Sequence, residues 1–140
     1  MNFVIDHSVV IRWFFGDGKP QDLSYVRGVL DAMKSGNAIV PVVWGLEVAN
    51  VISRAEAQGL VTEARSEAFL ERLVGLAIDA DGGSVDHALS STLNLARRYK
   101  LSSYDASYLE LALRQGVALA TLDADLRKAA KKAGVEILRA

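Results

Sequence analysis

The stretch FVIDHSVV at residues 3–10 decides the fold. In it an apolar run, residues 3–5, is followed by the acidic residue Asp6 and then by the start of a helical pattern. Similar apolar runs recur at 38–43, 117–121 and 135–138, a weaker one lies at 76–78, and longer helical patterns separate them. This alternation predicts βαβ units, whose parallel strands are covered by helices on both faces. We therefore expect an α/β fold with a short parallel sheet of about four to five strands.

Six helical patterns follow the first one along the chain. They lie at 22–35, 44–58, 62–77, 84–99, 104–115 and 124–133. Four of them are followed by glycines, Gly36, Gly59, Gly116 and Gly134, which suit the left-handed conformation that ends many helices. Only the weak apolar run separates the patterns at 62–77 and 84–99, so a helical hairpin packed against the sheet is an alternative there.

The composition excludes several classes of protein. With 51% hydrophobic and 24% charged residues over 140 positions, the chain is expected to form a single domain, residues 1–140. The absence of cysteine excludes a disulfide scaffold, a thiolate metal site and a catalytic cysteine. There is no signal-peptide pattern and no apolar run near the ~18 residues of a membrane span, so we expect a soluble, cytoplasmic protein.

Charge gives no general argument for nucleic-acid binding, because the net charge is -1. Basic residues do gather at 97–100 and again at 127–132. Such runs on helices are usually solvated surface, and we interpret both clusters in that way.

Two acidic residues follow apolar runs. Asp6 comes directly after residues 3–5, and Asp123 comes two residues after 118–121. Both should therefore stand at the carboxyl edge of the parallel sheet, where ligands bind in such folds. Each also precedes a helical pattern, so each has an alternative role as a helix N-cap.

Glu47 lies in an apolar helical pattern. Apart from Glu47 and Asn50, residues 42–52 are apolar, which predicts a mostly buried helix with these two side chains on one face. A buried carboxylate needs compensation, which a bound metal ion would supply. An ion pair with Arg54 is the alternative.

Asp105 shares a helix face with Tyr108, Leu109 and Ala112, and that face should look inward, whereas Glu110 can point outward. Asp105 has an alternative role as a first-turn acid that favours the positive end of the helix dipole. Four converging carboxylates would repel one another strongly and would need a cation. Without cysteine or histidine ligands, such a set suits Mg²⁺ or Mn²⁺.

Four segments in this order carry a resemblance to a known family: residues 3–14, 44–50, 102–109 and 121–123. Together they resemble a PIN domain, and more narrowly the VapC-like toxins of bacterial toxin–antitoxin pairs. The resemblance implies a three-layer α/β/α sandwich and a metal-dependent endoribonuclease that cuts RNA with a metal-activated water.

The resemblance also implies roles for individual residues. Asp6, Glu47, Asp105 and Asp123 would be the catalytic acids and would hold one or two Mg²⁺ or Mn²⁺ ions, with Ser8, Asn50 and Thr121 in support. Asp125 is a competitor for the fourth acid, although exposure in a helix is expected for it. Position 7 is more often small in such toxins, so we interpret His7 as incidental or substrate-facing and not as a ligand.

Partners follow from the same resemblance: an RNA substrate, a second copy in a homodimer, and a small antitoxin over an apolar groove. The aromatic cluster Trp13, Phe14 and Phe15 is expected in the core, and any surplus would imply an interface. Two other functions remain open. A haloacid-dehalogenase-type phosphatase would need a second aspartate where Ser8 stands, and a non-catalytic interaction module would use the acids as helix caps.

Overall fold

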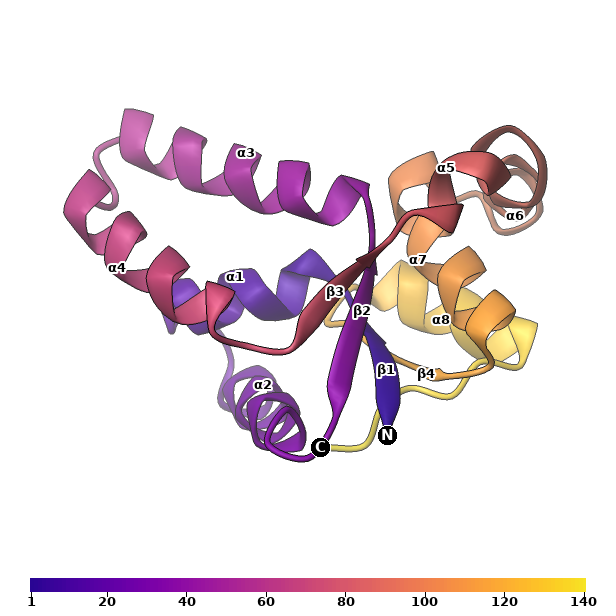
Figure 1. The fold of residues 1–140 in the computed structure, drawn as a ribbon, viewed down its shortest axis with the longest axis horizontal. Coiled ribbons are helices and arrows are strands. Elements are labelled where there is room, and N and C mark those ends of the chain that lie inside the picture. Colours follow the sequence, from indigo (N-terminus) through magenta and orange to yellow (C-terminus); the bar gives the residue numbers. More distant parts are fainter.

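The computed structural model describes residues 1–140 and contains a parallel sheet with the strand order β3-β2-β1-β4 (Figure 1). The strands are β1 (Asn2–Ile5), β2 (Asn37–Pro41), β3 (Ile78–Asp81) and β4 (Ala118–Ala120). β1 lies inside the sheet and pairs with both β2 and β4, so that Val4 lies opposite Ile39 and Leu119. The predicted α/β fold with a short parallel sheet is confirmed.

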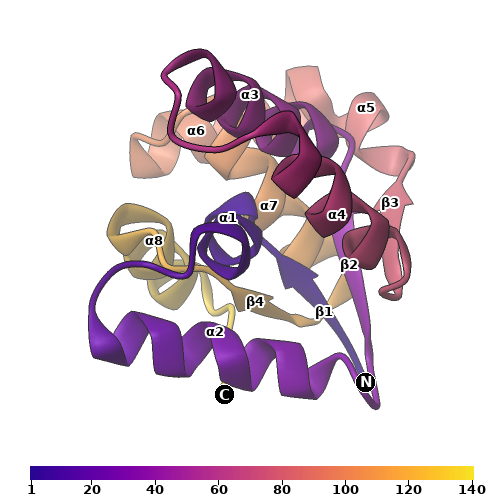
Figure 2. The same ribbon diagram turned by 90° about the vertical axis from the view of Figure 1, so that its left-hand side faces the viewer.

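Helices connect the strands and cover both faces of the sheet. They are α1 (His7–Phe15), α2 (Pro20–Ala32), α3 (Val43–Ala57), α4 (Glu63–Val74), α5 (Gly83–His87), the π-helical segment η1 (Ala88–Thr92), α6 (Leu93–Tyr99), α7 (Ser103–Gln115) and α8 (Ala124–Ala133). α1 to α4 form the layer on one side of the sheet and α5 to α8 the layer on the other (Figure 1), and Figure 2 views the molecule from the α1–α4 side. None of the helices combines the length and the apolar character that crossing a membrane requires.

The central strand explains why an uninterrupted apolar run opens the sequence. Phe3 and Ile5 point into the core beneath α1 to α4, whereas Val4 points into a second core beneath α7 and α8. All three side chains are fully buried. A parallel strand covered on both faces needs apolar residues at every position.

Three expectations about individual elements need correction. The run at 135–138 forms no strand, because only Ile137 pairs with Leu119 in an isolated bridge. The weak run at 76–78 leads into β3, which pairs with β2 along its length, so the helical-hairpin alternative is wrong. The single helix expected at 84–99 is divided into α5, the π-helical segment η1 and α6, and the Ser90 hydroxyl in η1 donates to the His87 carbonyl at 3.5 Å.

The expectation that α3 is mostly buried is wrong. Only Val48, Ile52 and Ala55 of α3 are buried, and Leu46 is 75% exposed. On one side the helix packs against α1 and β2, and elsewhere Trp44 and Ala49 border a groove beside α4. Composition predicted an apolar environment all round, but no element of the chain covers this second face.

Two smaller expectations also fail. Gly36 does not end a helix, because α2 stops earlier, at Ala32, and the chain instead passes so close to Met1 that a Cβ at Gly36 would clash with its carbonyl. Gly116 and Gly134 do adopt the left-handed conformation after their helices. Glu110 is only 3% exposed and not outward-facing, since Arg114 neutralises it within the same helix.

Candidate active site

The carboxyl edge of the sheet brings together acids from four elements. Asp6 follows β1, Asp123 follows the neighbouring strand β4, Glu47 lies in the second turn of α3, and Asp105 lies in the first turn of α7. β1 and β4 are hydrogen-bonded neighbours, so the two strand-end acids share one rim of the molecule. The negative charges of Asp123, Asp6 and Glu47 all act on Asp105, which places the four carboxylates around one region.

Asp6 is the buried centre of this region, with 1% of its surface exposed. Its Oδ2 accepts hydrogen bonds from the hydroxyls of Ser8 and Thr121, both at 2.7 Å. Its Oδ1 accepts a bond from His7 Nδ1 at 3.0 Å. Burial alone would raise the pKa of Asp6, but these hydrogen bonds and the charge of His7 hold it below the usual value, so the carboxylate stays ionised.

Ser8 and Thr121 also join the two loops that form the rim. The Ser8 hydroxyl accepts a bond from the Leu122 backbone N–H at 3.1 Å, and the Thr121 hydroxyl accepts one from the Asp123 N–H at 3.0 Å. Each hydroxyl therefore bridges Asp6 and the segment after β4. This arrangement positions Asp6 relative to Asp123 through short, directional contacts.

Glu47 is compensated by Tyr108 and His7, not by Arg54. The Tyr108 hydroxyl donates to Glu47 Oε1 at 2.6 Å, and His7 Nδ1 lies 3.4 Å from Glu47 Oε2. Arg54 makes no ion pair with Glu47, so that alternative is wrong. Burial raises the pKa of Glu47, and the bond from Tyr108 and the charge of His7 offset only part of the rise.

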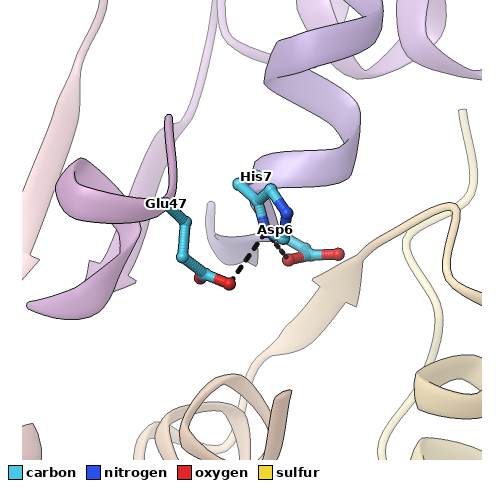
Figure 3. Close-up of side chains that lie close together, drawn as sticks. All are labelled: Asp6, His7 and Glu47. Carbon is cyan, nitrogen blue, oxygen red and sulfur yellow. Dashed lines mark hydrogen bonds and ion pairs between the residues drawn. The ribbon is translucent and has the colours of Figure 1, made fainter. Parts of the chain in front are cut away.

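His7 lies inside the acidic cluster, between Asp6 and Glu47 (Figure 3). Burial alone would lower its pKa, but the bond to Asp6 and the charges of Asp6, Glu47 and Asp105 raise it above the usual value. The surrounding acids therefore favour the protonated form of the imidazole. Its position directly after Asp6 was the available signal, but sequence does not show toward which neighbours a side chain at a helix start turns.

Asp105 has no hydrogen bond to its carboxylate, although its backbone N–H donates to the Ser102 hydroxyl at the start of α7. Partial burial raises its pKa, the charges of Asp123, Asp6 and Glu47 raise it further, and the result is about 6. This carboxylate is the member of the cluster that most lacks a positive partner.

The alternative role as a helix N-cap is wrong for one strand-end acid and right for the other. Asp6 occupies the N-cap position of α1 but makes no side-chain capping bond, so the capping role is wrong for it. Asp123 does cap α8, because its Oδ1 accepts a bond from the Leu126 N–H at 2.8 Å. The second oxygen of Asp123 remains available to face the cluster.

Two other sequence candidates lie apart from the cluster. Asn50 is exposed one turn beyond Glu47 and borders a shallow groove with Phe15 and Arg54. Asp125 is exposed on α8 and borders a different cleft. Neither contacts the four acids. Tyr108 was not singled out as a site residue, and its core-facing position gave no sign of the bond that its hydroxyl makes to Glu47.

The donor set fits a hard divalent cation. Asp6, His7 and Glu47 each offer a possible ligand atom within 4.8 Å of the others, whereas Asp105 and Asp123 are not part of this close set. Carboxylate oxygens are the ligands that Mg²⁺ and Mn²⁺ prefer. A cation here would also relieve the repulsion that adds to the effect of burial on the pKa of Asp105.

A helix-covered parallel sheet with carboxylates along its rim defines a class of small α/β nucleases, and comparison with known proteins agrees. Residues 3–132 match the PIN domain family, and the chain belongs to this family of nucleases. None of the curated proteins compared matches the sequence significantly.

Solved structures share the fold at low sequence identity. VapBC2 from Rickettsia felis, solved bound to a DNA fragment from its promoter, is 12% identical, with 99% of this chain and 98% of that chain covered and a TM-score of 0.69. FitAcB from Neisseria gonorrhoeae is 16% identical, with 98% of this chain and 96% of that chain covered and a TM-score of 0.58. A toxin–antitoxin complex from Klebsiella pneumoniae is 19% identical, with 86% of this chain and 85% of that chain covered and a TM-score of 0.57.

Proposed function

We propose that the protein is an Mg²⁺- or Mn²⁺-dependent endoribonuclease. The observation that carries the proposal is a buried, ionised Asp6 on the same rim as three further carboxylates, where partial burial and the charges of Asp123, Asp6 and Glu47 raise the pKa of Asp105 to about 6. Charges arranged in this way cost stability unless a cation binds between them. Such strained clusters are typical of functional sites.

The residues divide into two roles in this proposal. Asp6, Glu47, Asp105 and Asp123 would hold the ion, while Ser8 and Thr121 keep Asp6 oriented. Tyr108 fixes one oxygen of Glu47, and burial keeps its hydroxyl protonated by raising the pKa. When bound, the ion would lower the pKa of a coordinated water and neutralise charge on the scissile phosphate.

Cleavage of RNA by the purified protein tests the proposal. Asp105→Asn should abolish Mg²⁺-dependent cleavage, because it removes the carboxylate with no other partner. Asp31→Asn is the matched control, since Asp31 is exposed and pairs only with Lys34. Equal activity of Asp105→Asn and wild type would contradict the proposal, and cleavage of single-stranded DNA without cleavage of RNA would contradict the substrate.

The two rival functions agree less well with the site. A haloacid-dehalogenase-type phosphatase needs an aspartate at position 8, where the Ser8 hydroxyl instead donates to Asp6. An interaction module whose acids serve as caps fits Asp123 but not Asp6, which makes no capping bond. A metal-dependent nuclease uses all four acids.

We further propose that the nuclease is the toxin of a toxin–antitoxin pair and forms a homodimer. The support is an uncovered apolar groove of about 540 Å³ between α3 and α4, bordered by Trp44, Ile52, Leu70 and Val74. The similar folds from Rickettsia felis and Klebsiella pneumoniae were solved as antitoxin-containing assemblies. Co-expression with the protein of the neighbouring reading frame should yield a stable complex, and light scattering of the purified chain should give twice the monomer mass.

A further inference from the structure

A second polar cleft, of about 410 Å³, lies between α8 and the turn that joins α6 to α7. Four cations border it: Arg98 from the end of α6, Lys100 from the turn, and Lys128 and Lys132 from α8. Asp125 is the only acid on its wall, and Tyr99 is the only aromatic residue. The cleft is therefore strongly basic in a protein whose net charge is -1.

The fold selects particular members of the two basic clusters for this cleft. Lys128 and Lys132 are one turn apart on the same face of α8, whereas Lys131 points elsewhere and is exposed. Arg127 also turns away, because its Nε donates to the Thr121 carbonyl at 2.6 Å and its guanidinium covers Tyr25. Arg97, beside Arg98, does not border the cleft.

Lys100 is held at the cleft by an unusual backbone conformation. It is the only residue other than glycine with a positive φ, 53°, and it ends α6 with its N–H bonded to the Ala96 carbonyl. A side chain in this conformation costs about 1 kcal/mol, which a glycine would avoid. Because both the backbone strain and the three neighbouring cations cost stability, we infer that the charge of Lys100 has a function.

The two walls of the cleft are close in sequence to acids of the cluster. Asp125, two residues after Asp123 on α8, borders the cleft, and Lys128 and Lys132 follow along the same helix. On the other wall, Lys100 stands five residues before Asp105.

We propose that this cleft binds the phosphate backbone of the single-stranded RNA that flanks the bond cut at the four acids. The inference rests on the proposed nuclease function and adds a surface for the substrate. Four carboxylates repel a polyanion, so the strand must gain its affinity beside them, and lysine and arginine side chains supply it through phosphate contacts.

Binding of a labelled, unstructured RNA, measured by fluorescence anisotropy across a salt series, tests the proposal. The background is Asp105→Asn with Mg²⁺ present, which keeps the RNA intact. The test variant is Lys128→Ala/Lys132→Ala, and the matched control is Arg97→Ala/Lys131→Ala, which removes the same charge from exposed positions outside the cleft. Melting temperatures of both variants establish that they fold.

The test variant should bind roughly tenfold more weakly at low salt, and its plot of log affinity against log salt should flatten by about 1.4, or about 0.7 for each lost phosphate contact. The control should change little. In cleavage by the protein with Asp105 intact, the test variant should raise KM for a long RNA and leave kcat close to that of wild type.

Equal losses in both variants would overturn the proposal, since net charge alone would then explain binding. No loss in either would overturn it too, as would loss of antitoxin binding in the test variant with RNA affinity intact. In these cases Mg²⁺-dependent RNA cleavage by the wild type still supports the nuclease function. If the wild type neither cut nor bound RNA, both the proposed nuclease function and this inference would be wrong.

Discussion

Asp6 is a buried carboxylate that depends on hydroxyl groups from two different loops. Thr121 is fully buried, and its hydroxyl both donates to Asp6 and accepts from the Asp123 N–H. Thr92 is buried to a similar degree, but its hydroxyl has no partner. The chain therefore offers two buried threonines that differ mainly in hydrogen bonding.

Thr121→Val should destabilise the protein by about 1–3 kcal/mol, because it leaves a buried carboxylate oxygen and a backbone N–H short of a partner. It should also reduce RNA cleavage by misplacing Asp6. Thr92→Val is the control and should be neutral or slightly stabilising. Urea denaturation measures both, and equal free energies of unfolding for the two variants would refute the role of the Thr121 hydroxyl.

Asp105 should make the metal-free protein less stable as the pH rises. Its pKa is about 6 in the folded state against 3.8 for the model carboxyl, so the folded state holds the extra proton between these values. Stability from this group is therefore full below about pH 4 and is lost as the pH approaches 6. In EDTA at pH 7.5, Asp105→Asn should melt at a higher temperature than wild type while being inactive.

Millimolar Mg²⁺ should raise the melting temperature of the wild type, because an ion that binds only the folded state stabilises it. Asp105→Asn should show a smaller rise, since one carboxylate of the set is gone. Asp31→Asn should respond as the wild type does. An unchanged melting temperature of the wild type in Mg²⁺ would argue against an ion at the cluster.

The sequence predicted where two of the site residues lie but not which side chains contact one another. Asp6 and Asp123 could be placed because strand ends of a parallel sheet share one edge. The place of His7 between Asp6 and Glu47, and the exposure of Asn50, depend on how helices α1 and α3 are rotated against each other. Periodicity along one helix carries no information on that rotation.

Among the helices, α7 carries the strongest electrostatic link to the edge of the sheet. Arg114 donates to the buried Glu110 at 2.7 Å within α7 and to Asp81 at the end of β3 at 2.6 Å. The bond from Arg114 holds the pKa of Asp81 below its usual value, so Asp81 stays ionised. The edge strand is thus fastened to the helix that bears Asp105.

Arg114→Met should destabilise the protein by about 3–5 kcal/mol, because it removes the arginine partner of the buried Glu110 and leaves only His87 nearby, at 3.7 Å. Adding Glu110→Gln should restore part of the loss by removing that charge. Arg72→Met, on the exposed face of α4 and outside any ion pair, is the control and should stay within about 0.5 kcal/mol of wild type. Chemical denaturation measures all three, and an Arg114→Met variant as stable as the control would contradict the link.

The positions of helices and strands were predicted better than the burial of their side chains. Apolar runs and glycine caps located most strands and helices, because both signals are local in sequence. The burial of Glu110 and the exposure of Leu46 were predicted with the wrong sign. The burial of Glu110 depends on the packing of α7 against α5, η1 and α6, and Leu46 is exposed because no element of the chain covers it. The apolar sequence of α3 is consistent with either a buried helix or a binding surface.

The molecule as a whole separates three kinds of surface. The acidic rim lies at the carboxyl edge of the sheet, the basic cleft borders α8, and the apolar groove lies between α3 and α4 on the opposite layer. A protein partner in the groove and a nucleic acid in the cleft would therefore approach from different sides.

Val74→Glu should weaken the complex with an antitoxin, because Val74 borders the groove and is 85% exposed. Leu89→Glu is the control, since Leu89 is 89% exposed on η1, in the other layer. Both variants should melt near the wild-type temperature. Co-purification should fall only for Val74→Glu, and an equal fall for Leu89→Glu would place the partner elsewhere.

The central position of β1 also governs when the enzyme can arise during translation. β1 is synthesised well before its neighbour β4, which begins only at Ala118 and is followed by Asp123. At about 5–20 residues per second, several seconds separate the synthesis of Asp6 from that of Asp123. During this time a nascent chain carries Asp6 without an assembled nuclease site.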